Sequence, residues 1–225
     1  MSLIRGNVVF RRYWSARLVS YLGDQLARTA LLIAAYDRYG GTAVALLLLA
    51  TTAPRLLGPL LGALADRFDQ RRLMVGCDLT QALLYLALAL LAPPLPVLLA
   101  AVTAATLAAT AFTPAGRSLL PRLVGRERLP AANAQLAVGM NIGFAAGPAL
   151  GGLMLATIDL TSTLIVDAAT FVASALLIGG VRGLSAPGAP TPPREPYRQV
   201  LGAGMRVVRT SGVVCGRSRS VSWCW

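Results

Sequence analysis

Histidine and lysine are absent from this sequence, and charged residues make up only 13% of it. An average soluble domain carries about 25% charged residues. Because 56% of the chain is hydrophobic and the mean hydropathy is +0.63, too little polar surface remains to cover a water-soluble globule of this size. The composition therefore predicts a membrane protein.

The missing residue types also exclude several kinds of chemistry. Without histidine the chain has no imidazole to bind a metal or carry a proton, and no Ser/His/Asp or Cys/His arrangement can form. Without lysine it cannot complete the phosphate-binding loop of ATP-driven systems. The three cysteines, Cys77, Cys215 and Cys224, lack the spacing of a zinc or redox site. We therefore expect no enzyme activity, no metal and no cofactor.

Positive charge is what the sequence does have: all 21 basic residues are arginine, against 9 acidic residues, for a net charge of +12. A nucleic-acid-binding protein would gather such residues on one basic face beside stacking aromatic rings. Here the arginines fall mostly between apolar runs instead. This distribution favours the lipid bilayer, and not nucleic acid, as the partner of the chain.

Six runs are apolar and long enough to cross a bilayer core, which takes about 20 helical residues. They cover residues 14–37, 43–64, 72–92, 95–116, 131–157 and 160–180, with short connections between them. This pattern predicts an all-α membrane protein in which residues 1–181 form a bundle of six transmembrane helices.

Arginine is distributed unevenly between the two sets of connections. The N-terminal arm, the 66–72 turn, the 117–128 region and the residues beyond Val181 hold 18 of the 21 arginines, whereas the other set holds only Arg38. Cytoplasmic loops are enriched in basic residues, so we expect the Arg-rich set and both termini to face the cytoplasm. Six spans, an even number, also put both termini on the same side of the membrane. We expect this membrane to be the cell (inner) membrane.

The character of the sequence changes after the sixth run. Residues 182–210 combine a Pro-rich linker with apolar residues at roughly helical spacing, which is typical of an amphipathic helix on the cytoplasmic surface. Residues 211–225 are too short and too polar to span, and they hold two of the three tryptophans and two of the three cysteines. The composition of this atypical tail resembles out-of-frame translation.

The turn between the second and third runs reads "GALADRFDQRRLM", residues 62–74. Its arginines can anchor the topology at anionic headgroups, but this role does not explain its aspartates. The turn resembles the loop 2–3 signature of the major facilitator superfamily, which is roughly Gly-x-x-x-Asp-Arg-x-Gly-Arg-Arg. Asp69 and Gln70 depart from that pattern, and "DRFD-x-RRLM" is similar to the branch of enterobactin exporters and macrolide efflux proteins. The matching positions are Gly62, Asp66, Arg67, Arg71 and Arg72.

A second resemblance lies in the fifth run. The stretch "GMNIGFAAGPALGG" is similar to the glycine-rich fifth-helix motif of antiporters in this superfamily. Small residues at every fourth position allow helices to pack closely, and a proline bends a helix. Generic small-residue packing within a bundle is the alternative explanation. The motif residues are Gly139, Gly143, Gly147, Pro148, Gly151 and Gly152.

The resemblance implies a fold, an activity and partners. The chain would be the N-terminal bundle of an antiporter that exports a small amphipathic organic molecule, such as a siderophore or a drug, in exchange for protons. A second six-helix half, which this sequence does not contain, would be its partner. In this family the carboxylate of the loop motif helps to hold the cytoplasmic gate closed. Asp66 would therefore be the latch, with Arg67, Arg71 and Arg72 as its partners and lipid anchors.

Ionisable residues inside the runs give evidence that does not depend on the resemblance, because each costs at least ~2.5 kcal/mol at bilayer depth. Asp24 lies about 15 Å from Trp14 along a helix, near the midplane, and Arg28 follows on the same face. The two either couple protons and contact the cargo or form a structural ion pair. Three further residues of this kind are Arg55 and Asp78, which we expect to bind each other, and Asp167.

The sequence as a whole predicts a secondary active transporter, a proton-coupled exporter connected with drug resistance, of which this is the N-terminal half. The alternative is a chain that transports nothing by itself. It would then be a truncated or frameshifted membrane fragment, or an accessory multi-pass protein. The unusual tail, residues 211–225, is the feature that favours this alternative.

Overall fold

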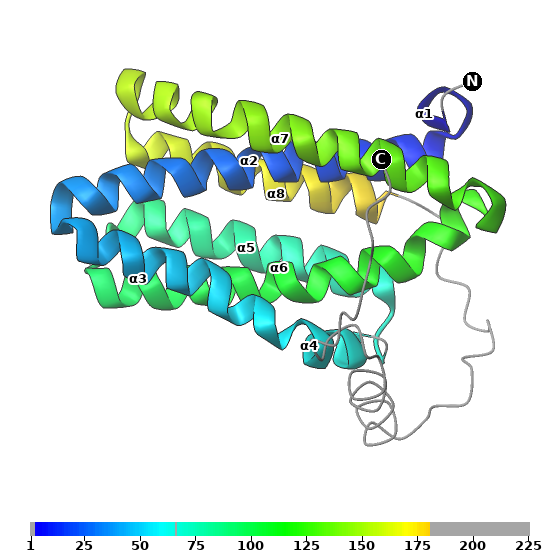
Figure 1. Cartoon of the computed structure of the whole chain (residues 1–225), viewed down its shortest axis with the longest axis horizontal. Helices are drawn as coiled ribbons and strands as arrows, with labels where there is room; N and C mark the ends of the chain where they lie inside the picture. The colour runs from blue at the N-terminus through cyan, green and yellow to red at the C-terminus, as the bar shows by residue number, and fades with distance from the viewer. Residues whose placement is uncertain (1–2, 66, 181–225) are drawn as a thin grey trace, which may run out of the picture. The chain divides into compact units, whose positions relative to one another are not determined.

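The computed structural model describes residues 3–65 and 67–180 (Figure 1). Within these ranges every regular element is a helix. The predicted linker, surface helix and tail, residues 182–225, lie outside the described residues, as does Asp66. The elements are α1 (Leu3–Gly6), α2 (Val8–Tyr39), α3 (Gly41–Thr52), the 3-10 helix η1 (Ala53–Leu57), α4 (Gly58–Ala65), α5 (Gln70–Leu91), α6 (Leu95–Val124), the 3-10 helix η2 (Arg126–Arg128), α7 (Leu129–Thr157) and α8 (Leu160–Gly179).

Five helical segments in the described part of the chain are long and apolar enough to cross a membrane. They are Gly41–Ala63, Gln70–Leu91, Leu95–Val124, Arg126–Thr157 and Leu160–Gly179. Each overlaps one of the last five runs predicted from the sequence. The chain is thus an all-α, multi-pass membrane protein.

The first predicted run, residues 14–37, lies within α2, which is not among these five segments. With 32 residues, α2 is about 48 Å long and has the length to span. Its charged residues, which include Arg17, Asp24 and Arg28, lower its hydropathy. The helix packs against α7 and α8 and also contacts α3, so part of its polar surface faces protein and not lipid.

Two helices extend further than the hydropathy predicts, and they do so at the same end of the bundle. α2 begins at Val8, and α6 continues to Val124 through Pro114 and Pro121. Asn7 connects them: its side chain accepts a hydrogen bond from the Phe10 amide as the N-cap of α2, and its Nδ2 donates to the Leu123 carbonyl at 2.9 Å. Part of the predicted 117–128 connection is therefore helical.

The helices form one packed bundle in which α2 is central. It lies between α7 and α8, while α5 packs against α8 and α6, and α3 packs against α6 and α2 (Figure 1). The α2–α7 and α5–α8 interfaces are the most extensive ones between the described helices.

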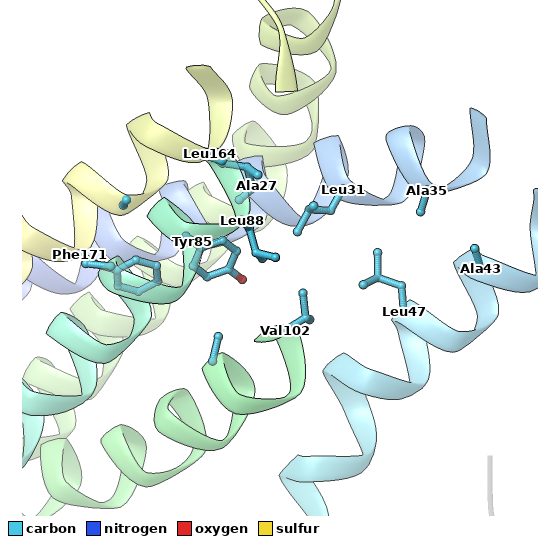
Figure 2. Close-up of a cluster of buried hydrophobic side chains, with 14 residues drawn as sticks. Ala27, Leu31, Ala35, Ala43, Leu47, Tyr85, Leu88, Val102, Leu164 and Phe171 are labelled. Atoms are coloured by element: carbon cyan, nitrogen blue, oxygen red, sulfur yellow. The ribbon is translucent and has the colours of Figure 1, made fainter. Parts of the chain in front are cut away.

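A cluster of buried apolar side chains fills one half of the bundle (Figure 2). In it the rings of Tyr85 and Phe171 stack between α5 and α8, with centroids 5.8 Å apart. Leu31, Leu47 and Val102 join α2, α3 and α6 to the same cluster. A second cluster, around Phe10, Met74, Phe112 and Ile178, occupies the half nearer the start of α2.

Candidate functional site

A pocket lies between α2, the α3–η1 segment, α5 and α6. Three charged side chains line it: Asp24 and Arg28 from α2, and Arg55 from η1. The remaining polar lining residues are Thr51, Gln81, Tyr85 and Thr106, and the apolar ones are Leu31, Leu32, Leu47, Val102, Ala105 and Ala109. The pocket thus combines three charged side chains with uncharged polar and apolar ones.

Arg55 reaches the pocket because the second span is not a continuous α-helix. The 3-10 segment Ala53–Leu57 interrupts it, with Pro54 in its first turn. A 3-10 helix has fewer residues per turn than an α-helix, so the residues that follow are rotated relative to a regular continuation. The sequence predicted one helix over residues 43–64 and did not foresee this break.

Asp24 is half-buried and lies within electrostatic reach of Arg17, Arg55 and Arg28. Arg28 was the predicted partner, one helical turn away. Arg55 comes from a different helical segment, and Arg17 lies about two turns earlier on α2. The charge of Asp24 is therefore surrounded from two sides.

Arg17 is a functional candidate that the sequence analysis missed, because it counted this residue with the N-terminal arm. Its guanidinium carbon lies 4.5 Å from the ring centroid of Tyr21 and 4.6 Å from that of Phe112, and it donates a hydrogen bond to the Tyr21 hydroxyl. Such cation–π contacts hold an arginine among apolar neighbours. The available signal was spacing, since Arg17 precedes Asp24 by seven residues, about two helical turns.

Asp78 does not bind Arg55, contrary to the prediction. Asp78 is only 1% exposed, and neither of its carboxylate oxygens has a hydrogen-bond partner among the described residues, whereas Arg55 is exposed at the pocket. Position along the helix placed the two residues at similar depths, but it could not give the direction in which each side chain points.

Asp167 is fully buried on α8, where it contacts the backbone region of α2. One of its oxygens accepts a hydrogen bond from the Thr170 hydroxyl at 3.3 Å, and the other has no partner within the described part of the chain. Gly23 lies directly opposite, because a Cβ at that position would overlap Asp167 and Thr170. The glycine is therefore what allows α2 and α8 to approach each other beside Asp24.

Four glycines of the fifth-helix motif face α2 at every fourth position. They are buried, and a Cβ added to any of them would come within 3.5 Å of α2 atoms. Such close approach is what small residues permit between membrane helices. Gly139, Gly143, Gly147 and Gly151 meet, in this order, Trp14, Tyr21, Gln25 and Leu26.

The two remaining residues of the motif do not take part in this contact. A Cβ added to Gly152 would meet no described atom within 4 Å, and Pro148 is exposed. Nearer the start of α7, the Trp14 indole donates a hydrogen bond to the Gln135 carbonyl at 2.8 Å. The α2–α7 interface thus combines backbone contact with one long-range hydrogen bond.

The loop motif is partly described. Gly62 packs near Pro114 of α6, and Arg71 donates a hydrogen bond to the Gly179 carbonyl at the end of α8. Arg67 and Arg72 are exposed. The predicted latch, Asp66, lies outside the described residues, so its role stays a prediction.

Asp69, which departs from the family pattern, is the N-cap of α5. Its side chain accepts a hydrogen bond from the Arg72 amide at 2.9 Å. Aspartate is among the residues favoured at this position, because it satisfies one of the free amides of the first turn. The departure therefore has a local structural role.

No group of three or more Cys, Asp or Glu side chains within residues 3–65 and 67–180 is arranged to hold a metal ion.

Comparison with known proteins gives a family. Residues 13–225 match the family model of the Major Facilitator Superfamily. The match includes residues 211–225, which the sequence analysis had set apart as atypical.

Three of the curated relatives are named as efflux proteins. The multidrug efflux pump Tap of Mycolicibacterium fortuitum is 34% identical over 79% of this chain and 42% of its own length. Tap of Mycobacterium tuberculosis is 30% identical over 88% of this chain and 52% of its own length. Macrolide efflux protein A of Streptococcus pyogenes is 26% identical over 77% and 44%. The chain thus spans about half the length of the relatives that it matches.

Proposed function

The chain belongs to the Major Facilitator Superfamily, and from this premise we propose that it forms one bundle of a proton-coupled exporter of small amphipathic organic molecules, such as drugs or siderophores. The observation that carries the proposal is the pocket lined by Asp24, Arg28 and Arg55. Superfamily transporters hold their substrates in such sites between helices, near the middle of the membrane.

The charges of the pocket support an aqueous cavity and not a lipid-facing surface. A charged side chain at the bilayer centre costs at least ~2.5 kcal/mol unless it meets a partner or water. Arg28 is half-buried and Arg55 is exposed, and both face the same pocket as Asp24. This arrangement suits a cavity that fills with water or cargo during transport.

The lining supports a partly apolar cargo. Leucine, valine and alanine contribute six of the thirteen lining residues, and Tyr85 adds an aromatic ring with a hydroxyl group. Sites of this composition bind ligands through apolar area and use a few polar groups for orientation. The names of the relatives, which refer to multidrug and macrolide efflux, favour a drug-like molecule over a siderophore.

Asp24 is our candidate for proton coupling. Among the described residues that line the pocket it is the only carboxylate, and its three neighbouring arginines come from two helical segments. When the bundle moves, a change in the distance to these cations changes the stability of the carboxylate relative to the acid. Asp24 would bind a proton in one conformation and release it in the other.

The test is export driven by a pH gradient in proteoliposomes that hold a reconstructed full-length transporter, in which a second six-helix bundle completes this chain. Asp24→Asn should abolish proton-driven export, and Asp37→Asn, an exposed carboxylate of the same helix, should leave it unchanged. Asp24→Asn combined with Arg28→Gln should not restore export. Export retained by this double variant would reduce Asp24 to half of a structural ion pair, because both buried charges would then have been removed together.

We also propose that a second six-helix bundle completes the transporter. The segment Gly41–Ala63 and the segments containing α6 and α7 bury only 17–22% of their residues, compared with 44% for α5 and α8. The less buried helices include α3 and α6, which border the pocket. Alternating access requires such a surface, because one bundle rocks against the other around the site.

The cytoplasmic gate and the topology remain proposals of the same kind. We infer that both termini and the 66–72 turn face the cytoplasm of the cell membrane, because arginine gathers on that side. A cysteine placed at Arg67, which is exposed, should resist an impermeant reagent added to intact cells.

For the cytoplasmic gate, Asp66→Asn should insert normally and lose most export. Export at the wild-type rate would leave the turn with an anchoring role alone.

A further inference from the structure

A second polar site lies outside the pocket, in the interface between α5 and α8. Asp78 of α5 is 1% exposed and Ser174 of α8 is 0% exposed. Among the described residues, neither carboxylate oxygen of Asp78 has a hydrogen-bond partner, and neither does the Ser174 hydroxyl oxygen. The two groups are near enough to interact, but they make no hydrogen bond of normal geometry.

The charged form of Asp78 is poorly supported at this position. A serine hydroxyl can donate one hydrogen bond, so at least one oxygen of a carboxylate would stay unpaired in a fully buried place. In the neutral acid the O–H can donate to Ser174 Oγ, and the other oxygen, although still unpaired, carries no full charge, so that its burial costs less. The geometry therefore fits a carboxyl that carries a proton.

Asp78 lies between the pocket and the Arg-rich ends of the helices. It is eight residues from the start of α5, and Ser174 is five residues from the end of α8, which correspond to about 12 Å and about 8 Å along the two helix axes. Asp24 is sixteen residues into α2, about 24 Å from its start. A proton that moves from Asp24 towards these ends approaches the depth of Asp78.

Asp78 interacts with groups on α2, α5 and α8. Ser174 of α8 and Arg17 and Asp24 of α2 act on it, while its own charge acts on Tyr13 of α2 and on the neighbouring thiol of Cys77 on α5. From α6 the ring of Phe112 packs on Arg17. Three arginines, Arg17, Arg28 and Arg55, lie within electrostatic reach of Asp24. Of these three, Arg17 also acts on Asp78.

We propose that Asp78 is a second proton-binding carboxyl of this transporter, which holds its proton against Ser174 and shares Arg17 with Asp24. The step is an acid dissociation: the O–H bond at one Asp78 oxygen breaks, the electron pair stays on the carboxylate, and the proton passes to water. Arg17 stabilises the carboxylate that forms. The coupling of this step to export rests on the proposed function, whereas the proton-binding site itself does not.

The site is tested by infrared spectroscopy of the full chain in phospholipid vesicles. At neutral pH exposed carboxyl groups are ionised, so the carbonyl band of a protonated acid reports buried groups. Asp78→Asn should remove one such band, and Asp37→Asn should remove none. Ser174→Ala, which keeps the carboxyl, should shift the same band because the acid loses its hydrogen-bond acceptor.

Titration of this band tests the role of Arg17. In Arg17→Gln the band should persist to higher pH than in the wild-type chain, because the cation that stabilises the carboxylate is gone. The proposal is overturned if no protonated-acid band is lost in Asp78→Asn or shifted in Ser174→Ala. An unchanged titration in Arg17→Gln would overturn the sharing of Arg17.

Export measured on the same variants separates the two proposals. Asp78→Asn should reduce pH-driven export severalfold, while Asp37→Asn leaves it unchanged. Wild-type export in Asp78→Asn, with the band lost, would overturn the coupling role of Asp78. If the wild-type chain shows the band but the transporter completed with the second six-helix bundle shows no proton-driven export, the proposed function is contradicted and the proton site is supported.

Discussion

The α2–α7 and α5–α8 interfaces join neighbouring helices of the same bundle in opposite ways. In the first, glycines at every fourth position of α7 remove side chains, so that the backbones come close. In the second, large side chains interdigitate and the rings of Tyr85 and Phe171 stack, while Asp78 and Ser174 remain without hydrogen-bond partners in the described part of the chain.

Because of this difference, we expect one interface to be sensitive to the volume of its side chains and the other to their charge. Packed interfaces without voids respond to every added carbon atom, because neighbouring groups must move to admit it. Buried polar groups respond to the gain or loss of a proton, because their stability depends on having a partner. The α2–α7 interface should therefore be disrupted by bulky substitutions, and the α5–α8 interface by changes that alter protonation.

The largest effect is expected from Gly147→Leu in the α2–α7 interface. A Cβ at this position would overlap the Gln25 side chain and lie 3.4 Å from the Gln25 Cα, so the backbone of α2 would have to move. Overpacking of this kind typically costs about 1–3 kcal/mol. The folded yield in membranes should fall strongly, as measured by the fraction of monodisperse protein after extraction.

Gly152→Leu is the matched control for this substitution. It places the same side chain five residues further along α7, where an added Cβ would meet no described atom within 4 Å. Its yield should stay close to that of the wild-type chain. Equal losses in the two variants would show that glycine itself, and not contact with α2, is required.

A smaller effect is expected from Gly23→Ala, between α2 and α8. The added methyl group would overlap oxygen atoms of Asp167 and Thr170 and lie 3.1 Å from the Thr170 Cβ. Because these obstacles are side chains that can move, we expect the low end of the overpacking range, about 1 kcal/mol. Resistance to unfolding by detergent would measure the loss.

The double variant Gly23→Ala with Thr170→Ala should recover part of this stability, because one of the obstructing oxygens is removed. Non-additivity of the two changes would indicate direct contact. Gly76→Ala on α5, where an added Cβ meets no described atom within 4 Å, serves as the control and should not destabilise. Simple additivity in the double variant would contradict the contact.

The sequence predicted the features that depend on position along a helix. Hydropathy located the five apolar spans, and the spacing of Gly139, Gly143, Gly147 and Gly151 marked one helix face. Both are one-dimensional patterns with a fixed physical period, so they could be read without knowledge of any neighbour. The loop motif could also be read from the sequence alone, and its resemblance indicated the family.

The features that the sequence analysis missed depend on rotation about a helix axis and on contacts between helices. Arg55 and Asp78 have similar depths, but the 3-10 break at Ala53–Leu57 turns Arg55 to the pocket while Asp78 faces α8. The sequence places Arg17 with the N-terminal arm, because charge near the start of a span usually indicates an interface. Its two aromatic neighbours, Tyr21 and Phe112, become visible only when α2 and α6 are placed together.

Asp69→Ala should weaken the α5–α8 interface from its end. The variant removes the acceptor for the Arg72 amide, and loss of an N-cap typically costs about 0.5–2 kcal/mol. Asp69→Gly introduces the residue of the family pattern and should cost less, on the order of a few tenths of a kcal/mol. Detergent resistance of the two variants measures the difference, and an alanine variant as stable as the glycine variant would contradict the capping role.

The smallest effect concerns Asp159, the N-cap of α8 at the opposite end of this helix from Ser174. Hydrogen bonds from Ser162, including one from its amide at 3.0 Å, lower the pKa of this exposed carboxyl below its ordinary value. Because the folded-state pKa is depressed, the cap contributes stability that is fully present above the pKa of the unfolded chain. This contribution is lost as the pH falls through the folded-state pKa. Asp159→Asn keeps a capping side chain that does not titrate, so its stability should vary less with pH in the acid range.

This pH dependence also separates the two ends of the α5–α8 interface. A proton held at Asp78 in the folded chain acts in the opposite direction: its contribution to stability is fully present below the ordinary Asp pKa of about 3.9 and is lost as the pH rises above it, because the unfolded chain then ionises. Detergent resistance measured across this pH range should therefore show a loss on acidification below about pH 4, which Asp159→Asn reduces, and a loss as the pH rises above about 4, which Asp78→Asn removes. If the wild-type and Asp159→Asn chains lost stability in parallel on acidification, the acid-side loss would not come from the cap of α8.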